Sequence, residues 1–157
     1  MHTMSNSARN KNVQTLYEDY LKNRSIKLSY EEFLYILTMF PSLLVCMSDG
    51  KLDKEEWVGI NSIASGLAEE FAATDLNNRD KEQLRAMLNS EFRYLLDNLD
   101  RWEKKYLSAL KSYLDENNSE REFILESMYL FANAADGISG VEQEAINKLS
   151  KRLELTF

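Results

Sequence analysis

Apolar residues recur every three or four positions along most of the chain, which is the spacing of one face of an α-helix. Stripes of this kind cover residues 13–21, 33–47, 57–71, 84–99, 102–114, 123–131 and 145–153. The sequence contains no alternating apolar and polar run long enough to predict a strand. It therefore predicts an all-α fold of six or seven helices.

Four short motifs predict where helices begin. In each motif, Ser or Asp is followed three positions later by Glu, which is the pattern of a capping box. The pairs are Ser29 with Glu32, Asp53 with Glu56, Ser119 with Glu122, and Ser139 with Glu142. Each pair predicts a helix start just before one of the apolar stripes.

Three kinds of residue predict where helices end or bend. Gly50 and Gly137 follow apolar stripes and predict their ends, as do Asn117 and Asn118. Pro41 lies within the stripe 33–47. Because proline removes a backbone donor and clashes with the preceding turn, it predicts a kink or a division of that helix.

An acidic turn occurs twice in the chain. The first copy, 48–56, reads Ser-Asp-Gly-Lys-Leu-Asp-Lys-Glu-Glu, and the second, 134–142, reads Ala-Ala-Asp-Gly-Ile-Ser-Gly-Val-Glu. Apolar residues match at several positions before each Asp-Gly, and after the glycine the second copy is one residue shorter. The sequence thus predicts two pseudo-symmetric helix–turn–helix repeats that pack around a shared core, with the middle helices completing a bundle.

Composition limits the classes of function. A chain of 157 residues fits a single domain. Its net charge of −7 argues against a nucleic-acid partner and fits a surface that takes up cations. The sequence has no apolar run of about 18 residues and no recognisable signal peptide, so we expect a cytoplasmic protein without direct membrane insertion. The single cysteine, Cys46, lies in an apolar run and is expected to be a small buried residue.

The acidic turns contain the candidate binding residues. They are not EF-hands, because the first two ligand positions of the loop would be Val45 and Met47. If the repeats pack pseudo-symmetrically, both turns fall at one end of the bundle and their carboxylates converge, an arrangement that suits Ca²⁺ or Mg²⁺. The residues concerned are Asp49, Asp53, Glu56, Asp136 and Glu142. Helix capping and turn formation explain each of these residues as well, so both interpretations stay open.

Catalysis finds little support in the sequence. The single histidine is His2, near the start of the chain, and the glycines are isolated rather than grouped in a phosphate-binding loop. We therefore predict no enzyme.

Aromatic side chains are expected mainly in the core. The alternative is that some of them line a groove for a partner helix, namely Tyr30, Tyr35, Tyr94 and Trp102.

The two acidic turns in an all-helical chain resemble the TerB-like family of bacterial tellurite-resistance proteins. The likeness covers residues 29–157, so that residues 1–28 are an N-terminal extension with one short helix. The resemblance implies a cytoplasmic protein linked to tellurite or chemical-stress resistance, with no established enzymatic activity. It also implies an acidic surface suited to metal ions, formed here by the five carboxylates of the two turns, and membrane-bound protein partners.

The second turn departs from the first in one respect. Ser139 stands where the first copy has Asp53, so the second half of the candidate site has fewer ligands. We expect a non-enzymatic TerB-like protein that binds a divalent cation. The alternative is a helical protein-interaction adaptor without metal, in which the acidic turns only cap helices.

Overall fold

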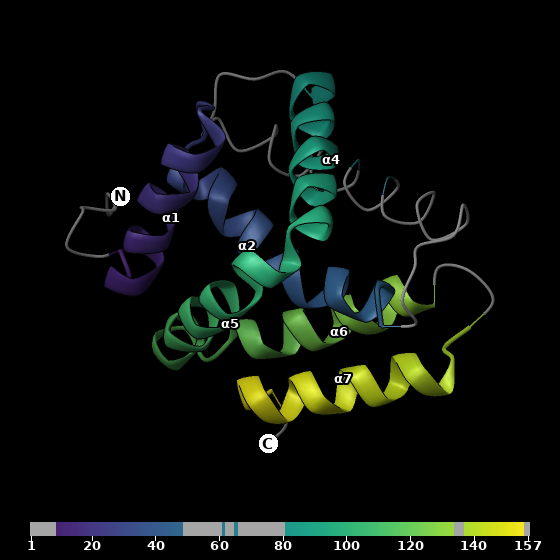
Figure 1. The fold of residues 1–157 in the computed structure, drawn as a ribbon. Coiled ribbons are helices and arrows are strands. Elements are labelled where there is room, and N and C mark those ends of the chain that lie inside the picture. Colours follow the sequence, from purple (N-terminus) through teal and green to yellow (C-terminus); the bar gives the residue numbers. More distant parts are fainter. Residues whose placement is uncertain (1–8, 49–60, 62–64, 66–80, 134–136, 156–157) are drawn as a thin grey trace.

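The structure, a computed structural model, describes residues 9–48, 61, 65, 81–133 and 137–155. The helices in this part of the chain are α1 (Lys11–Arg24), α2 (Tyr30–Cys46), α4 (Lys81–Asp97), α5 (Leu99–Glu116), α6 (Glu120–Ala132) and α7 (Gly140–Leu153) (Figure 1). No strand occurs among the described residues. The prediction of an all-α fold is confirmed.

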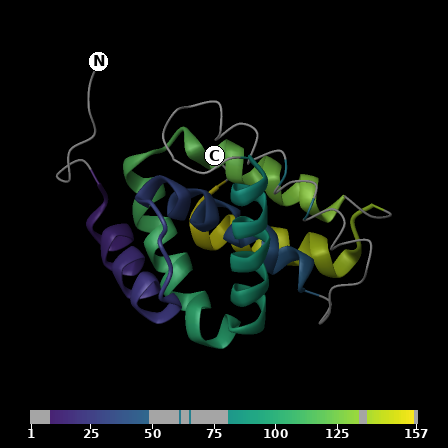
Figure 2. The ribbon, with the colours of Figure 1, turned by 90° about the horizontal axis from the view of Figure 1, so that it is seen from above.

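Helix α2 is the centre of the bundle. It contacts each of the other five helices, and Figures 1 and 2 show it passing through the middle of the molecule. Its charged residues, Glu31 and Glu32, are confined to the first turn, and the rest of the helix is almost entirely apolar. A helix that is apolar on all sides is stable only when it is covered on all sides. The sequence of α2 therefore dictates its central position.

Of the two outcomes predicted at Pro41, a kink or a division, the division does not occur. Helix α2 continues from Tyr30 to Cys46, with Pro41 buried inside it. Proline within a helix costs about 3 kcal/mol, because one backbone hydrogen bond is lost and its ring clashes with the preceding turn. Packing of α2 against the five other described helices offsets this cost.

The N-terminus of α2 is fixed as its sequence predicts. The backbone N–H of Glu32 donates to Ser29 Oγ at 3.0 Å, and the backbone N–H of Ser29 donates to Glu32 Oε1 at 2.9 Å. These are the two reciprocal bonds of a capping box.

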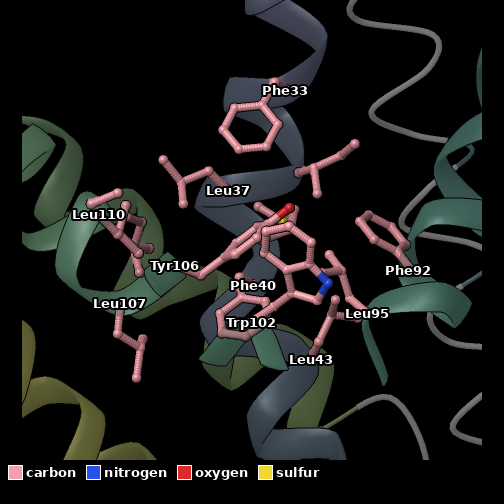
Figure 3. Packing of buried hydrophobic residues seen from close by; sticks show 14 of the residues in the cluster. Phe33, Leu37, Phe40, Leu43, Phe92, Leu95, Trp102, Tyr106, Leu107 and Leu110 are labelled. Carbon is pink, nitrogen blue, oxygen red and sulfur yellow. The ribbon is translucent and has the colours of Figure 1, made fainter. Parts of the chain in front are cut away.

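Aromatic rings of α2 pack against rings of the helices around it. Figure 3 labels Phe33 and Phe40 of α2, Phe92 of α4, and Trp102 and Tyr106 of α5. The ring centroids of Phe40 and Tyr106 lie 4.7 Å apart, and those of Tyr20 and Trp102 lie 5.1 Å apart in an edge-on arrangement. Tyr20, Phe40, Trp102 and Tyr106 are all fully buried. Pairs at these separations add about 0.5–1.5 kcal/mol each beyond the burial of their area. The expectation that aromatic residues mainly form the core is confirmed for these rings.

A buried carboxylate joins α1 to α4. Glu91, which is 2% exposed, accepts a hydrogen bond from Tyr20 Oη at 2.5 Å. The guanidinium of Arg24 donates to both carboxylate oxygens of Glu91 at 2.9 Å and lies 4.0 Å above the ring of Tyr94. Burial and the neighbouring Glu91 carboxylate raise the pKa of Tyr20 far above its ordinary value, and hydrogen bonding to Glu91 raises the pKa of Arg24. Tyr20 therefore keeps its proton, and Arg24 its charge, at any ordinary pH.

Removal of this carboxylate should be strongly destabilising. We expect Glu91→Ala to lower the free energy of unfolding by about 3 kcal/mol, since it leaves the Arg24 guanidinium and the Tyr20 hydroxyl without their acceptor. Glu144→Ala on α7 is the matched control, because its partner Lys148 lies 3.5 Å away and both side chains are exposed. That change should cost less than about 1 kcal/mol. Urea denaturation measures the free energy of unfolding of both variants. Equal decreases for Glu91→Ala and Glu144→Ala would contradict the role of Glu91 as the buried link between α1 and α4.

Candidate functional site

Most of the predicted cation-binding residues lie outside the part of the chain that the structure describes. These are Asp49, Asp53, Glu56 and Asp136, and the predicted capping box of Asp53 and Glu56 lies outside it with them. The convergence of the two acidic turns stays a prediction. Glu142 is the member of the set that can be placed.

Glu142 caps the start of α7. Its backbone N–H donates to Ser139 Oγ at 3.0 Å, and its side-chain Oε1 accepts from the backbone N–H of Ser139 at 2.9 Å. Ser29 and Glu32 make the same pair of bonds at the start of α2, where there is no acidic turn. The arrangement of Glu142 is thus that of an ordinary capping box. Among the described residues, no group of three or more His, Cys, Asp and Glu side chains is placed to hold a metal ion.

The capping box predicted for Ser119 and Glu122 is wrong. Ser119 has a right-handed helical backbone (φ −65°, ψ −18°), and its side chain makes no capping hydrogen bond. The backbone N–H of Glu120 donates to the carbonyl of Asn117 at 3.0 Å. The chain thus enters α6 through a tight turn, and Ser119 never adopts the extended conformation that a capping residue needs.

Arg121, which is not among the residues predicted from the sequence, fixes this junction instead. Its buried guanidinium donates to the carbonyl of Leu114 at 2.5 Å, to the carbonyl of Glu154 at 2.8 Å and to Asp115 Oδ1 at 2.9 Å. Hydrogen bonds from Lys111 and Arg121 lower the pKa of Asp115. One side chain thus joins the end of α5, the start of α6 and the end of α7. The sequence does contain a signal for this role. Arg121 follows the predicted helix end at Asn117, and a cation in that place can satisfy the last backbone carbonyls of the helix.

The predicted repeat is not confirmed. The alignment of the two copies pairs Leu43 with Leu130 and Ile36 with Phe123. Leu43 and Ile36 are fully buried on α2, whereas Leu130 is 61% exposed and Phe123 is 39% exposed on α6. The same alignment pairs Leu37 with Ile124, and both are buried. The two helices therefore share part of an apolar pattern without sharing the same buried face.

Three large apolar side chains of α6 lie at the surface, and we call them the α6 strip: Phe123, Tyr129 and Leu130. Phe123 and Leu130 are seven residues apart, so they lie on one side of the helix. Tyr129 is 37% exposed, and its hydroxyl accepts a hydrogen bond from Gln143 Nε2 at 3.0 Å. Val141, on the first turn of α7, is 49% exposed. In the sequence these residues belong to the apolar stripe 123–131, and their positions alone do not tell which side of α6 other helices cover.

The groove predicted from Tyr30, Tyr35, Tyr94 and Trp102 is not formed as such. Trp102 and Tyr30 are buried, and Trp102 Nε1 donates to Tyr94 Oη at 2.9 Å within the core. A different groove, with a volume of about 500 Å³, lies open to solvent between α1 and α5. Its charged lining residues, Asp19 and Lys105, pair with each other at 3.0 Å. It presents no arrangement that indicates a ligand.

No helix in the described part of the chain is both long and apolar enough to cross a membrane.

Comparison of the chain with protein-family models, with curated proteins and with solved structures gave no match in any of the three. The resemblance to the TerB-like family therefore rests on the two acidic turns alone.

Two serines with the same sequence motif should respond differently to substitution. We expect Ser139→Ala to lower the free energy of unfolding by about 1 kcal/mol, because one backbone N–H of α7 loses its acceptor. Ser119→Ala should change it by less than about 0.5 kcal/mol, because Ser119 makes no such bond and is exposed. Urea denaturation of both variants measures the difference. A loss for Ser119→Ala as large as that for Ser139→Ala would contradict the assigned helix starts.

Proposed function

We propose that this chain is a non-enzymatic helical adaptor that binds a protein partner through the α6 strip. The observation that carries the proposal is the exposure of Leu130, which at 61% is the largest among the exposed large apolar side chains of the described residues. Burial of a Leu or Phe side chain contributes about 1.5–3 kcal/mol. Aromatic and apolar side chains grouped on one helix are typical anchors of a protein interface.

The resemblance to the TerB-like family supports a cellular role for this adaptor. It implies a cytoplasmic protein that serves tellurite or chemical-stress resistance and works beside membrane-bound partners. The non-enzymatic character is supported by the sequence, in which the single histidine is His2.

A second candidate function is the binding of Ca²⁺ or Mg²⁺ at the acidic turns. The observation that favours it is the repetition of the Asp-Gly turn with carboxylates close behind it. Asp49, Asp53, Glu56 and Asp136 would be the main ligands. Glu142 would contribute less, because one of its oxygens already accepts a backbone N–H.

Substitution on the α6 strip should abolish partner binding without unfolding the chain. We expect the intact protein to capture a specific protein from an extract of its source cells, and Leu130→Ser to lose that capture. Lys104→Ser, on the exposed surface of α5, is the control and should retain it. Thermal melts should show that both variants remain folded. Equal capture by Leu130→Ser and wild-type protein would contradict the proposal, as would capture that disappears with a chelator.

Cation binding is tested by thermal melts of chelator-stripped protein with Ca²⁺, Mg²⁺, Mn²⁺ and Zn²⁺. An ion that binds only the folded state stabilises it by about 2.7 kcal/mol at a hundred times its dissociation constant. For a chain of this length the midpoint should rise by roughly 5–10 °C. The rise should be absent in the double variant Asp49→Asn/Asp136→Asn. No rise with any ion would leave the acidic turns as helix caps only.

A further inference from the structure

The exposed charges of α6 beside the strip are acidic. Glu126 lies three residues after Phe123 and four before Leu130, so that it is on the same side of the helix as both. Glu122 is also exposed, one residue before Phe123. A partner that covers the apolar side chains would therefore approach these two carboxylates.

Among the described residues, no cation forms an ion pair with Glu122 or Glu126. Arg121, the one cation of α6, is buried, and its guanidinium donates to Leu114, Asp115 and Glu154 rather than to the strip. The exposed cations of α7 are Lys148, Lys151 and Arg152, in the half of that helix that runs alongside the start of α6 (Figure 1). Lys148 pairs with Glu144 of the same helix at 3.5 Å.

The apolar and acidic groups on this side of α6 favour one class of macromolecule as the binding partner over the others. Nucleic acid and the anionic surface of a bilayer both repel carboxylates, and both are bound through Lys and Arg. An amphipathic helix with basic residues flanking its apolar side offers both kinds of complementary group. The net charge of −7 on the whole chain would also attract such a segment over a longer range.

We infer that the α6 strip takes a basic amphipathic helix of a partner protein. Its apolar side packs on Phe123 and Leu130, and its Lys or Arg side chains pair with Glu122 and Glu126. This inference rests on the proposed function, since it assigns the chemistry of the partner at the same strip.

The test uses the intact chain and two labelled synthetic peptides of about five helical turns, or about 18 residues. Both carry Leu on one face, and the other face carries Lys in one peptide and Glu in the second. Fluorescence anisotropy at low salt measures their binding. The Lys peptide should bind at least about tenfold more tightly than the Glu peptide, and Leu130→Ser should weaken its binding by about tenfold or more.

Charge on the strip is tested with two variants of equal net charge. Glu122→Gln/Glu126→Gln should weaken binding of the Lys peptide by about fivefold at low salt, because two ion pairs are lost. Asp100→Asn/Glu103→Gln, on the exposed side of α5, should leave it unchanged. At about 0.5 M salt, where charges are strongly screened, the two variants should bind the Lys peptide equally well.

Three results would overturn the inference. If both peptides bind equally and both are lost with Leu130→Ser, the strip docks helices regardless of charge, and the proposed function alone survives. If Leu130→Ser leaves binding of the Lys peptide unchanged, the attraction is general and not located at the strip. If the chain binds vesicles of phosphatidylcholine and phosphatidylserine through Leu130, the strip faces a membrane. Failure of the extract capture, in contrast, counts against the proposed function itself.

Discussion

The fold depends on the burial of one helix. Helix α2 has charged residues only in its first turn and is otherwise apolar on all sides, so it is stable only within a shell of other helices. In the part of the chain that the structure describes, five helices form that shell, and each of them needs only one apolar face. The aromatic rings of α1 and α5 fill the space on one side of α2, and α6 and α7 cover another. The buried Glu91 of α4 binds Tyr20 and Arg24 of α1, and these bonds fix the position of α4 relative to α1.

Much of the helical architecture could be predicted from the sequence, because helix periodicity and capping chemistry are local. The start of α2 at Ser29 and the start of α7 at Ser139 follow from a side chain that bonds a backbone donor three residues away. Ser119 carries the same motif and does not cap. There Arg121 fixes the junction, and its position after the helix end at Asn117 is visible in the sequence. Its bond to the carbonyl of Glu154, 33 residues away, is not.

The candidate site shows the same limit of local reasoning. A sequence tells that Leu130 belongs to an apolar run, but not that the neighbouring helices leave it at the surface. The apparent repeat misleads for a related reason. Leu43 and Leu130 have equivalent places in the motif, yet α2 is enclosed on all sides and α6 is not. The function proposed from the structure thus lies on α6, whereas the sequence directed attention to the acidic turns, of which Glu142 has an ordinary capping role.

The measurement that tests the central claim most directly is site-specific photocrosslinking in the source cells. A photoreactive amino acid replaces Leu130 in the full chain, and the same amino acid replaces Lys104 in a parallel experiment. If the α6 strip binds a partner, irradiation yields one discrete protein adduct at position 130 and none at position 104. No adduct at either position, or the same adducts at both, would contradict the assignment of α6 as the binding surface.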